Sequence, residues 1–289
     1  MWMIDNNPSR HSHKPRGRTV ASWPNVLLVQ VPPVEQAAEL ARQVRRDVLG
    51  TGAEEQPLTD LKPLLRAGGF SLSRTHLFGR DGGLQALLAP RSGNWFSIEV
   101  DPEPQGGWRS VPGHLRRQVA MQRLRFRVCH EIAHSFFYDR TVSLPRRVVT
   151  DSPEQERFCD RFASALLLPE EMVAHQRVTP ASILRIQARY GVSLRMTAQS
   201  FADAHPHAFL ALLVANGEQA PYLRLQWRSS DRALPVRWWT ASWLQDALSA
   251  NAGRRDRDAV LQWNQRAIAA RWRALPGRRQ VLLSALTAP

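Results

Sequence analysis

Two histidines and a glutamate stand within five residues of one another, in the order His130-Glu131-Ile132-Ala133-His134. The surrounding run is apolar and compatible with a helix, in which one turn separates the two histidines. Both rings then project from one face and could share a metal ion. Glu131 lies beside that face, where a carboxylate could act as a base on a water molecule activated by the metal. Random placement gives this pattern in about one of a hundred chains of this composition, so a second segment has to support it.

The second segment carries the signals of a helix. Ser152 is a favourable N-cap, Pro153 suits the first helical position and Gln155 completes a capping box. The helix should end at Leu168, because a proline follows. The N-cap of this helix therefore follows His134 by 18 residues.

This second helix would present Glu156 and Asp160, four residues apart, on one face. Glu156 follows His134 by 22 residues, enough chain to bring the two helices antiparallel. Two histidines, one glutamate and an open water position make a usual catalytic zinc site. Asp160 could then lie behind the ligands and accept the free ring N–H of a ligating histidine. The alternative is an amphipathic helix whose two carboxylates are simply solvated.

Both segments resemble a known family. Residues 124–134 resemble the RxRFtlAHElgH helix of ImmA/IrrE-type zinc metallopeptidases, and residues 156–169 are similar to that family's ExEANxFAxxLLMP segment. Residues 190–201 resemble its downstream fxVSxxAxxxRL segment, so the resemblance covers about residues 36–203. The departures are Cys129 and Cys159 in place of Ala, Asp160 in place of Asn, and Ser200-Phe201 in place of Arg-Leu.

The resemblance implies a zincin-like α+β fold with one Zn²⁺ per chain, held by His130, His134 and Glu156, and with Glu131 as catalytic base. It implies a zinc-dependent endopeptidase with a narrow protein substrate. In this family the substrate is often a helix-turn-helix repressor that is cleaved to switch on a stress-response or mobile-element programme. The competing hypothesis is a non-catalytic regulator that uses the same fold to bind DNA or a partner protein.

A peptidase also needs a donor that stabilises the oxyanion formed at the scissile carbonyl. Suitable side chains belong to Tyr138, Tyr190, His205 and His207. The sequence does not choose among these four, and each also fits a purely structural role.

The chain is strongly basic. Its 289 residues carry a formal net charge of +14, and only Lys14 and Lys62 are lysines, so almost all of the cations are arginines. The positive electrostatic field of such a chain favours encounters with nucleic acid or with proteins bound to nucleic acid. Direct nucleic-acid binding is therefore a hypothesis beside the protein substrate, although abundant arginine is also typical of a G+C-rich genome.

The sequence favours a cytoplasmic protein. No apolar run of 18 residues predicts a transmembrane helix, and the first residues lack the regions of a secretory signal. The two cysteines, Cys129 and Cys159, are too few for a disulfide framework and suit a reducing compartment. They could be soft metal ligands or redox sensors, but we expect small buried packing groups, because the histidines and glutamate already supply enough ligands.

Three parts are predicted along the chain: a basic disordered tail at 1–32, a zinc metallopeptidase domain at 33–205, and a smaller mixed α/β domain rich in Trp and Arg at 206–289. The peptidase domain should begin with helices at 33–49 and 58–67. Strands at 70–78, 84–89 and 95–100 should follow as a small antiparallel sheet, the first two joined in a hairpin through the glycines at 79–83.

After the metal helices, residues 180–201 predict two helices around a short turn, Gly191-Val192-Ser193. This arrangement invites a DNA-binding helix-turn-helix interpretation. The turn is one residue shorter than that motif usually has, and the segment resembles a structural part of the peptidase family. We therefore favour a structural role.

Beyond residue 205 we expect a hairpin of strands at 208–214 and 222–228, a third strand at 236–239, and helices at 242–250, 256–274 and 278–286. Six of the ten tryptophans lie in this part, interleaved with arginine. Such mixing could stack nucleic-acid bases, but tryptophan is more often the core of a small domain.

Overall fold

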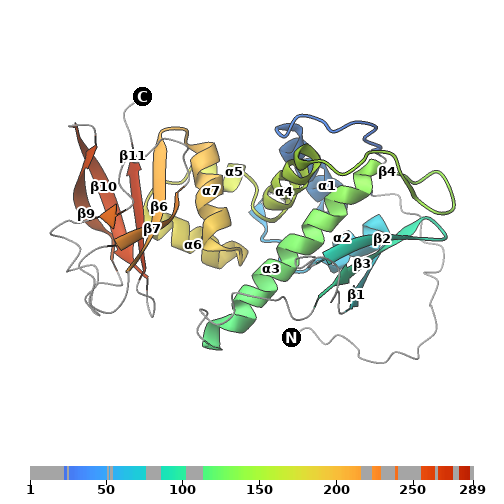
Figure 1. Ribbon diagram of the computed structural model, residues 1–289, viewed down its shortest axis with the longest axis horizontal. Coiled ribbons are helices and arrows are strands. Elements are labelled where there is room, and N and C mark those ends of the chain that lie inside the picture. Colours follow the sequence, from blue (N-terminus) through green and yellow to red (C-terminus); the bar gives the residue numbers. More distant parts are fainter. Residues whose placement is uncertain are drawn as a thin grey trace.

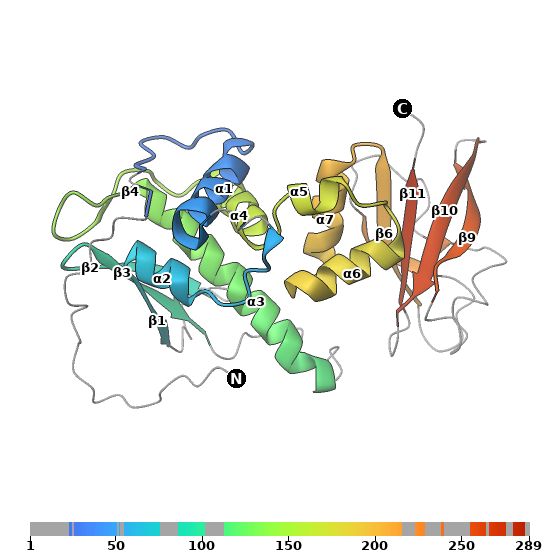
Figure 2. The same cartoon turned by 180° about the vertical axis from the view of Figure 1, so that it is seen from behind.

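The helices and strands gather in two groups that lie end to end along the long axis of the molecule (Figure 1, Figure 2). One group contains α1 to α4 with a three-stranded sheet, and the other contains α6, α7 and a six-stranded sheet. The structure is a computed structural model of the chain and describes residues 23–24, 26–50, 52, 55–75, 86–101, 113–215, 223–228, 238–239, 255–263, 266–275 and 280–286.

Helix α1 (Gln36–Leu49) packs against α4 (Pro153–Leu167). Its buried face is formed by Ala37, Leu40, Ala41, Val44 and Arg45. The helix ends as predicted at Gly50, where φ is 87° and the N–H bonds to the carbonyl of Arg46. The short helix α2 (Lys62–Gly68) follows; it begins four residues later than the predicted 58–67 and ends as expected before Gly69.

The helices that carry His130, His134 and Glu156, called here the metal helices, form where the local sequence signals predict them. α3 (Gly113–His134) is the longest helix described, and it packs along α4. At the start of α4 the Oγ of Ser152 accepts the N–H of Gln155 at 3.2 Å, and Pro153 occupies the first turn. The predicted N-cap and span of α4 are therefore confirmed. Between the helices run η3 (Ser135–Phe137) and a two-stranded ribbon of β4 (Tyr138–Asp139) and β5 (Arg146–Arg147).

The sheet beside α3 has the strand order β1-β3-β2, with β1 (Phe70–Arg74), β2 (Ala86–Arg91) and β3 (Trp95–Val100). β1 runs parallel to β3, so the predicted hairpin of the first two strands and the all-antiparallel sheet are wrong. The hairpin joins β2 to β3 instead. Gly93 and Asn94 make this turn with φ of 89° and 61°, which glycine and asparagine tolerate best. The glycines at 79–83 lie outside the described residues.

The first described residues pack onto the core, which corrects the disordered tail predicted at 1–32. The ring of Trp23 stacks on Phe136 with centroids 5.8 Å apart and meets Phe70 edge-on at 5.4 Å. The N–H of Leu28 donates to the carbonyl of Phe136 at 2.8 Å. Trp23 lies just before the short apolar run 26–29, which has neither a helical nor a strand period, so no signal in the sequence predicts this contact. Residues 1–22 lie outside the described part of the chain.

After residue 207 the described residues form one six-stranded sheet, in the order β8-β7-β6-β11-β10-β9. The predicted hairpin is confirmed as β6 (Ala208–Ala215) with β7 (Leu223–Arg228), and the third strand as β8 (Trp238–Trp239) on β7. The remaining strands are β9 (Arg257–Trp263), β10 (Arg266–Ala274) and β11 (Gln280–Leu286).

The helices predicted at 256–274 and 278–286 are therefore wrong, and the expected mixed α/β part is a sheet in its described residues. Alanine, arginine and glutamine favoured a helix locally, but β10 alternates: Ala270, Trp272 and Ala274 are buried while Ala269 and Arg271 are exposed. β11 is buried continuously from residue 281 to 285, and such a run cannot be distinguished from a buried helix by its period. The helix predicted at 242–250 lies outside the described residues.

Helices α6 (Pro180–Tyr190) and α7 (Leu194–Ala204) connect the two groups. They pack on β6, β10 and β11, and α7 also contacts the short helix α5 (Glu171–Ala174). One continuous buried cluster runs from α1 through both metal helices to β11. The domain boundary at 205/206 stays a prediction, because these helices pack directly on strands beyond it. None of the helices in the described ranges is long and apolar enough to span a membrane.

Candidate metal centre

Two ring nitrogens and a carboxylate converge where α3 and α4 cross. Nε2 of His130 lies 3.1 Å from Nε2 of His134. The carboxylate of Glu156 approaches the same two nitrogens, at 3.2 Å from His130 and 3.4 Å from His134. Ligands about 2.05 Å from a tetrahedral metal ion lie about 3.3 Å from one another. The two ring nitrogens and the carboxylate, which meets His130 through Oε2 and His134 through Oε1, have separations of that size. The structure thus brings together the residues that the sequence predicted as ligands.

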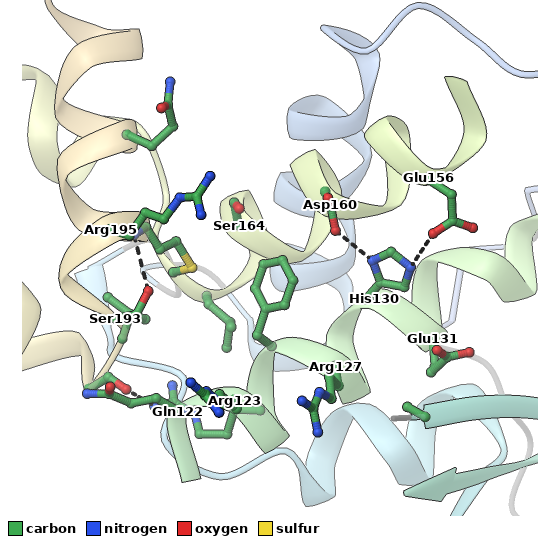
Figure 3. A pocket seen from close by; sticks show the side chains of 18 residues that line it. Gln122, Arg123, Arg127, His130, Glu131, Glu156, Asp160, Ser164, Ser193 and Arg195 are labelled. Atoms are coloured by element: carbon green, nitrogen blue, oxygen red, sulfur yellow. Dashed lines mark hydrogen bonds and ion pairs between the residues drawn. The ribbon is translucent and has the colours of Figure 1, made fainter. Parts of the chain in front are cut away.

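Each histidine is held by a contact at its other ring nitrogen. Nδ1 of His130 lies 2.9 Å from a carboxylate oxygen of Asp160, one turn after Glu156 on α4 (Figure 3). Nδ1 of His134 faces the side-chain amide of Gln155 at 3.5 Å. Such contacts fix the ring orientation and leave Nε2 facing a metal ion. Asp160 therefore lies where the sequence predicted it.

The charges around the histidines favour a cation. Burial disfavours protonation of His130, but the hydrogen bond that its ring donates to Asp160 and the charges of Glu131, Asp160 and Glu156 outweigh it and raise its pKa. A hydrogen bond from His134 is the largest cause that holds the pKa of Glu156 below its ordinary value. Three carboxylates and two imidazoles thus form a pocket of negative potential that suits a divalent metal ion.

Glu131 lies beside these ligands, facing the edge strand of the three-stranded sheet. Burial raises its pKa above the ordinary glutamate value, against the opposing effect of both histidines. Its carboxylate accepts a hydrogen bond from the backbone of Leu88. β2 pairs only with β3 among the described strands, so its other edge is open at Leu88. A carboxylate thus stands between a metal site and an open strand edge.

The donor atoms open into a cleft of about 1070 Å³, called here the metal cleft. Its walls are α3, α4, the start of α7 and the first residue of β2, and its metal end contains Glu131, Glu156 and Asp160 (Figure 3). A cleft of this size can hold several residues of a peptide. The reactive groups are therefore accessible to a large ligand.

Residues 114–201 match a peptidase family model, Peptidase M78, described as an IrrE N-terminal-like domain. This match supports the resemblance of the segment to the ImmA/IrrE peptidase family. The match covers slightly less than a third of the chain, but it contains α4, α6 and nearly all of α3 and α7, and with them every residue of the donor set. No curated protein matches the chain.

The ImmA/IrrE segment also contains two of the four predicted oxyanion donors. The hydroxyl of Tyr190 donates to the carbonyl of Glu55 at 3.3 Å, so it is used in the core. Tyr138 lies closer to the chemistry: its ring is half-buried against Phe96, and Glu131 and Arg147 both influence its pKa, which burial raises most.

The other two predicted donors lie beyond that segment, and none of the four is among the residues that line the metal cleft. Nε2 of His205 lies 3.2 Å from the carbonyl of Val173, and its ring stacks on Phe201. His207 is exposed. The geometry therefore gives most support to Tyr138, and the role of all four residues stays a prediction.

Both cysteines of the ImmA/IrrE segment are buried. The thiol of Cys159 comes within 4.8 Å of the ligand atoms of His130 and His134. Burial raises its pKa well above the ordinary value, and it raises the pKa of Cys129 to about 12. A protonated thiol is a poor metal ligand, since the thiolate is the binding form. Both residues thus have the packing environment that the sequence predicted.

Asp151 also approaches the site, with its ligand atoms within 4.8 Å of those of His134 and Glu156. It is already bound by the guanidinium of Arg147, which donates to both of its oxygens. Arg147 also donates to Oε1 of Gln155 at 3.2 Å. Arg147 therefore links the ribbon before α4 to the residue that faces His134.

The helix pair α6–α7 turns at Gly191 with φ of 60°, as a helix-turn-helix would. The first turn of α7, however, faces the metal cleft with Ser193, Arg195, Met196 and Gln199. In a DNA-binding pair the same turn would have to reach base edges. This placement favours the structural interpretation, with α7 as one wall of the cleft.

Two residues near the site had no functional signal in the sequence. Gln155 matched a capping box, but its buried side chain faces His134 and Arg147 instead. Arg127 lines the metal cleft one turn before Glu131 (Figure 3). Its position could have been predicted from the helical spacing, because residues 127 and 131 share a face of α3.

Proposed function

We propose that this protein is a zinc-dependent endopeptidase that hydrolyses a peptide bond in a specific protein substrate. The observation that carries the proposal is the triangle of His130, His134 and Glu156 donors with Glu131 beside it, facing the open edge of β2. The set of two histidines and one glutamate is a usual one for catalytic zinc. The match of residues 114–201 to a peptidase family model supports the same chemistry.

The open edge of β2 provides a place for the substrate backbone. An extended peptide can add to such an edge as a further strand, with its own amide groups bonded to the open ones. The backbone of Leu88, already bonded to Glu131, marks where that strand would pass the base. Pro90 has no N–H, which is tolerated in an edge strand.

His130, His134 and Glu156 would hold the zinc ion, and the ion would supply Lewis acidity at the scissile carbonyl and a water molecule that ionises near neutral pH. Glu131 would take a proton from that water and later donate it to the leaving amine. Burial of Glu131 supports this role, because a raised pKa brings a carboxylate nearer to the pH at which it must exchange protons. Asp160 and Gln155 would keep both rings oriented.

A helix-turn-helix repressor, cleaved to release a stress-response or mobile-element programme, is the substrate that we propose. Two properties support it: the resemblance of residues 114–201 to the ImmA/IrrE family, and the net charge of +14, which would favour encounters with a protein bound to DNA. A cytoplasmic location belongs to the same proposal.

The test is co-expression of the full chain with repressors encoded by neighbouring genes, followed by detection of cleavage fragments. Glu131→Gln should retain near-stoichiometric zinc and lose cleavage by at least about a hundredfold, since general base catalysis contributes about that much. Glu154→Gln is the matched control, because Glu154 is an exposed glutamate of α4 that pairs with Arg157. Undiminished cleavage by Glu131→Gln would overturn the proposed mechanism. A purified protein without zinc, unaffected by Glu156→Ala, would favour the non-catalytic regulator.

A further inference from the structure

The metal cleft changes its charge along its length. The end at the metal donors is acidic, with Glu131, Glu156 and Asp160 (Figure 3). The part that extends along α3 toward α7 is basic, with Arg123 and Arg127 on α3 and Arg195 on α7. A bound metal ion would offset the acidic end, but it would leave the basic part unchanged.

No hydrogen bond or ion pair with the described residues indicates a structural role for Arg127. Within the described ranges its guanidinium makes no hydrogen bond or ion pair, although it is half-buried. Burial lowers its pKa, the charge of Arg123 lowers it further, and Asp101 is the weaker, opposing influence. Its neighbour Arg125 is different, because it donates to the carbonyls of Leu58, Tyr190 and Gly191.

Arg195 faces the same space from α7. It is exposed in the first turn of that helix, and it too makes no hydrogen bond or ion pair with any residue that the structure describes. Two walls of one cleft thus present guanidinium groups to its interior. A partly desolvated cation without a bonded counter-charge is a ready site for an anion.

We propose that Arg123, Arg127 and Arg195 form a basic subsite that binds acidic side chains of the peptide substrate, close to the scissile bond. This inference rests on the proposed peptidase function and specifies the substrate class. Helical rise places Arg127 about 6 Å, and Arg123 about 12 Å, along α3 from Glu131. An extended peptide rises about 3.3 Å per residue. The subsite therefore selects Asp or Glu about two to four residues from the cleaved bond, on one side of it.

An acidic peptide fits this distribution of charge better than a nucleic acid does. A nucleic acid carries a phosphate at every nucleotide and would meet the carboxylates of Glu131, Glu156 and Asp160 at the metal end. A peptide can carry its charges at the basic part alone and present a neutral backbone to the metal donors.

The test uses the zinc-loaded full chain on a library of chymotryptic peptides from a whole proteome, which keep internal acidic and basic residues, with cleavage sites identified by mass spectrometry. Wild type should cleave sites that are enriched in Asp and Glu two to four residues from the scissile bond. The double variant Arg127→Glu with Arg195→Glu should lose this preference by about tenfold or more and accept Lys and Arg there, because an ion pair becomes a repulsion. Arg177→Glu, an exposed arginine outside the cleft, should retain the wild-type preference.

A binding measurement keeps the subsite testable if the protein cleaves nothing. Fluorescence anisotropy with a labelled Glu-containing hexapeptide should show binding that Arg127→Gln weakens by about tenfold and Arg177→Gln does not change. If the zinc-loaded wild-type protein cleaves no peptide but binds the hexapeptide in a way that depends on Arg127, the peptidase function is refuted and the proposed subsite is supported. Two results would overturn the subsite: wild-type cleavage sites without acidic enrichment, or a single-stranded oligonucleotide that binds more tightly than the peptide and depends equally on Arg127.

Discussion

The side-chain amide nitrogen of Gln155 lies 3.5 Å from Nδ1 of His134, on the side of the ring that faces away from Glu156. Oε1 of the same amide accepts a hydrogen bond from Arg147. A neutral histidine that binds metal through Nε2 carries its proton on Nδ1 and needs an acceptor there. Rotation of the amide would supply its oxygen to that proton and would give up the hydrogen bond from Arg147. A residue completely buried in α4 thus contacts the ring of a predicted ligand on α3.

Replacing Gln155 by Met should weaken zinc binding by about tenfold, because the shape is kept while the partner of His134 is lost. Gln155→Glu should restore the affinity, since a carboxylate can accept from Nδ1. Competition with a chromophoric zinc chelator measures both. Equal affinity of Gln155→Met and wild type would show that the contact does not orient the ligand.

Asp160→Ala should weaken zinc binding by about tenfold to a hundredfold, because Nδ1 of His130 then loses the acceptor at 2.9 Å. Asp160→Asn should lose much less, as the amide oxygen can still accept. The same chelator competition applies, with Glu154→Ala as the exposed control on α4. If Asp160→Asn binds zinc as weakly as Asp160→Ala does, then the negative charge of Asp160, rather than its hydrogen bond, stabilises the bound zinc.

Zinc should stabilise the fold, since its ligands connect α3 to α4. Binding that is specific for the folded state contributes about 2.7 kcal/mol when free zinc exceeds its Kd a hundredfold. The melting temperature should therefore rise with zinc and fall with a chelator. Glu156→Ala should abolish most of this shift. If zinc raises the melting temperature of Glu156→Ala as much as that of wild type, the zinc binds at another site.

Trp23→Ala should reduce the free energy of unfolding by about 2–4 kcal/mol, because the ring packs between Phe70 and Phe136. Trp95 is 38% exposed, so Trp95→Ala should cost less than about 1 kcal/mol. Urea unfolding followed by circular dichroism compares the two variants. Equal losses would indicate that Trp23 is not part of the core.

The sequence predicted best where short-range chemistry decides the structure. Ser152, Pro153 and the proline after Leu168 determine the ends of α4 through capping and ring geometry, which need no distant partner. The same holds for Gly50 at the end of α1. Spacing along two such helices was enough to predict Glu156 as the third ligand and Asp160 behind it.

Prediction from the sequence failed where contacts between residues far apart in the chain determine the structure. The parallel pairing of β1 with β3 depends on contacts that no local turn signal encodes. Ala269 to Ala274 favour a helix individually, but the neighbouring strands β9 and β11 make them a strand. Arg127 was overlooked for another reason: an arginine on a helix is usually solvated, and only the opposite wall from α7 makes it part of a cleft.

The close spacing of the ligands along the chain has a consequence for the order of biosynthesis. Glu156 follows His134 by only 22 residues, so closing that loop costs about 3 kcal/mol of chain entropy. α3 and α4 can pair once residues up to about 169 have left the ribosome, while the strands of the six-stranded sheet are still unmade. A nascent chain should therefore be able to capture a metal ion before the last 120 residues have emerged from the ribosome. Metal supply would then act on folding at its start, not on a finished protein.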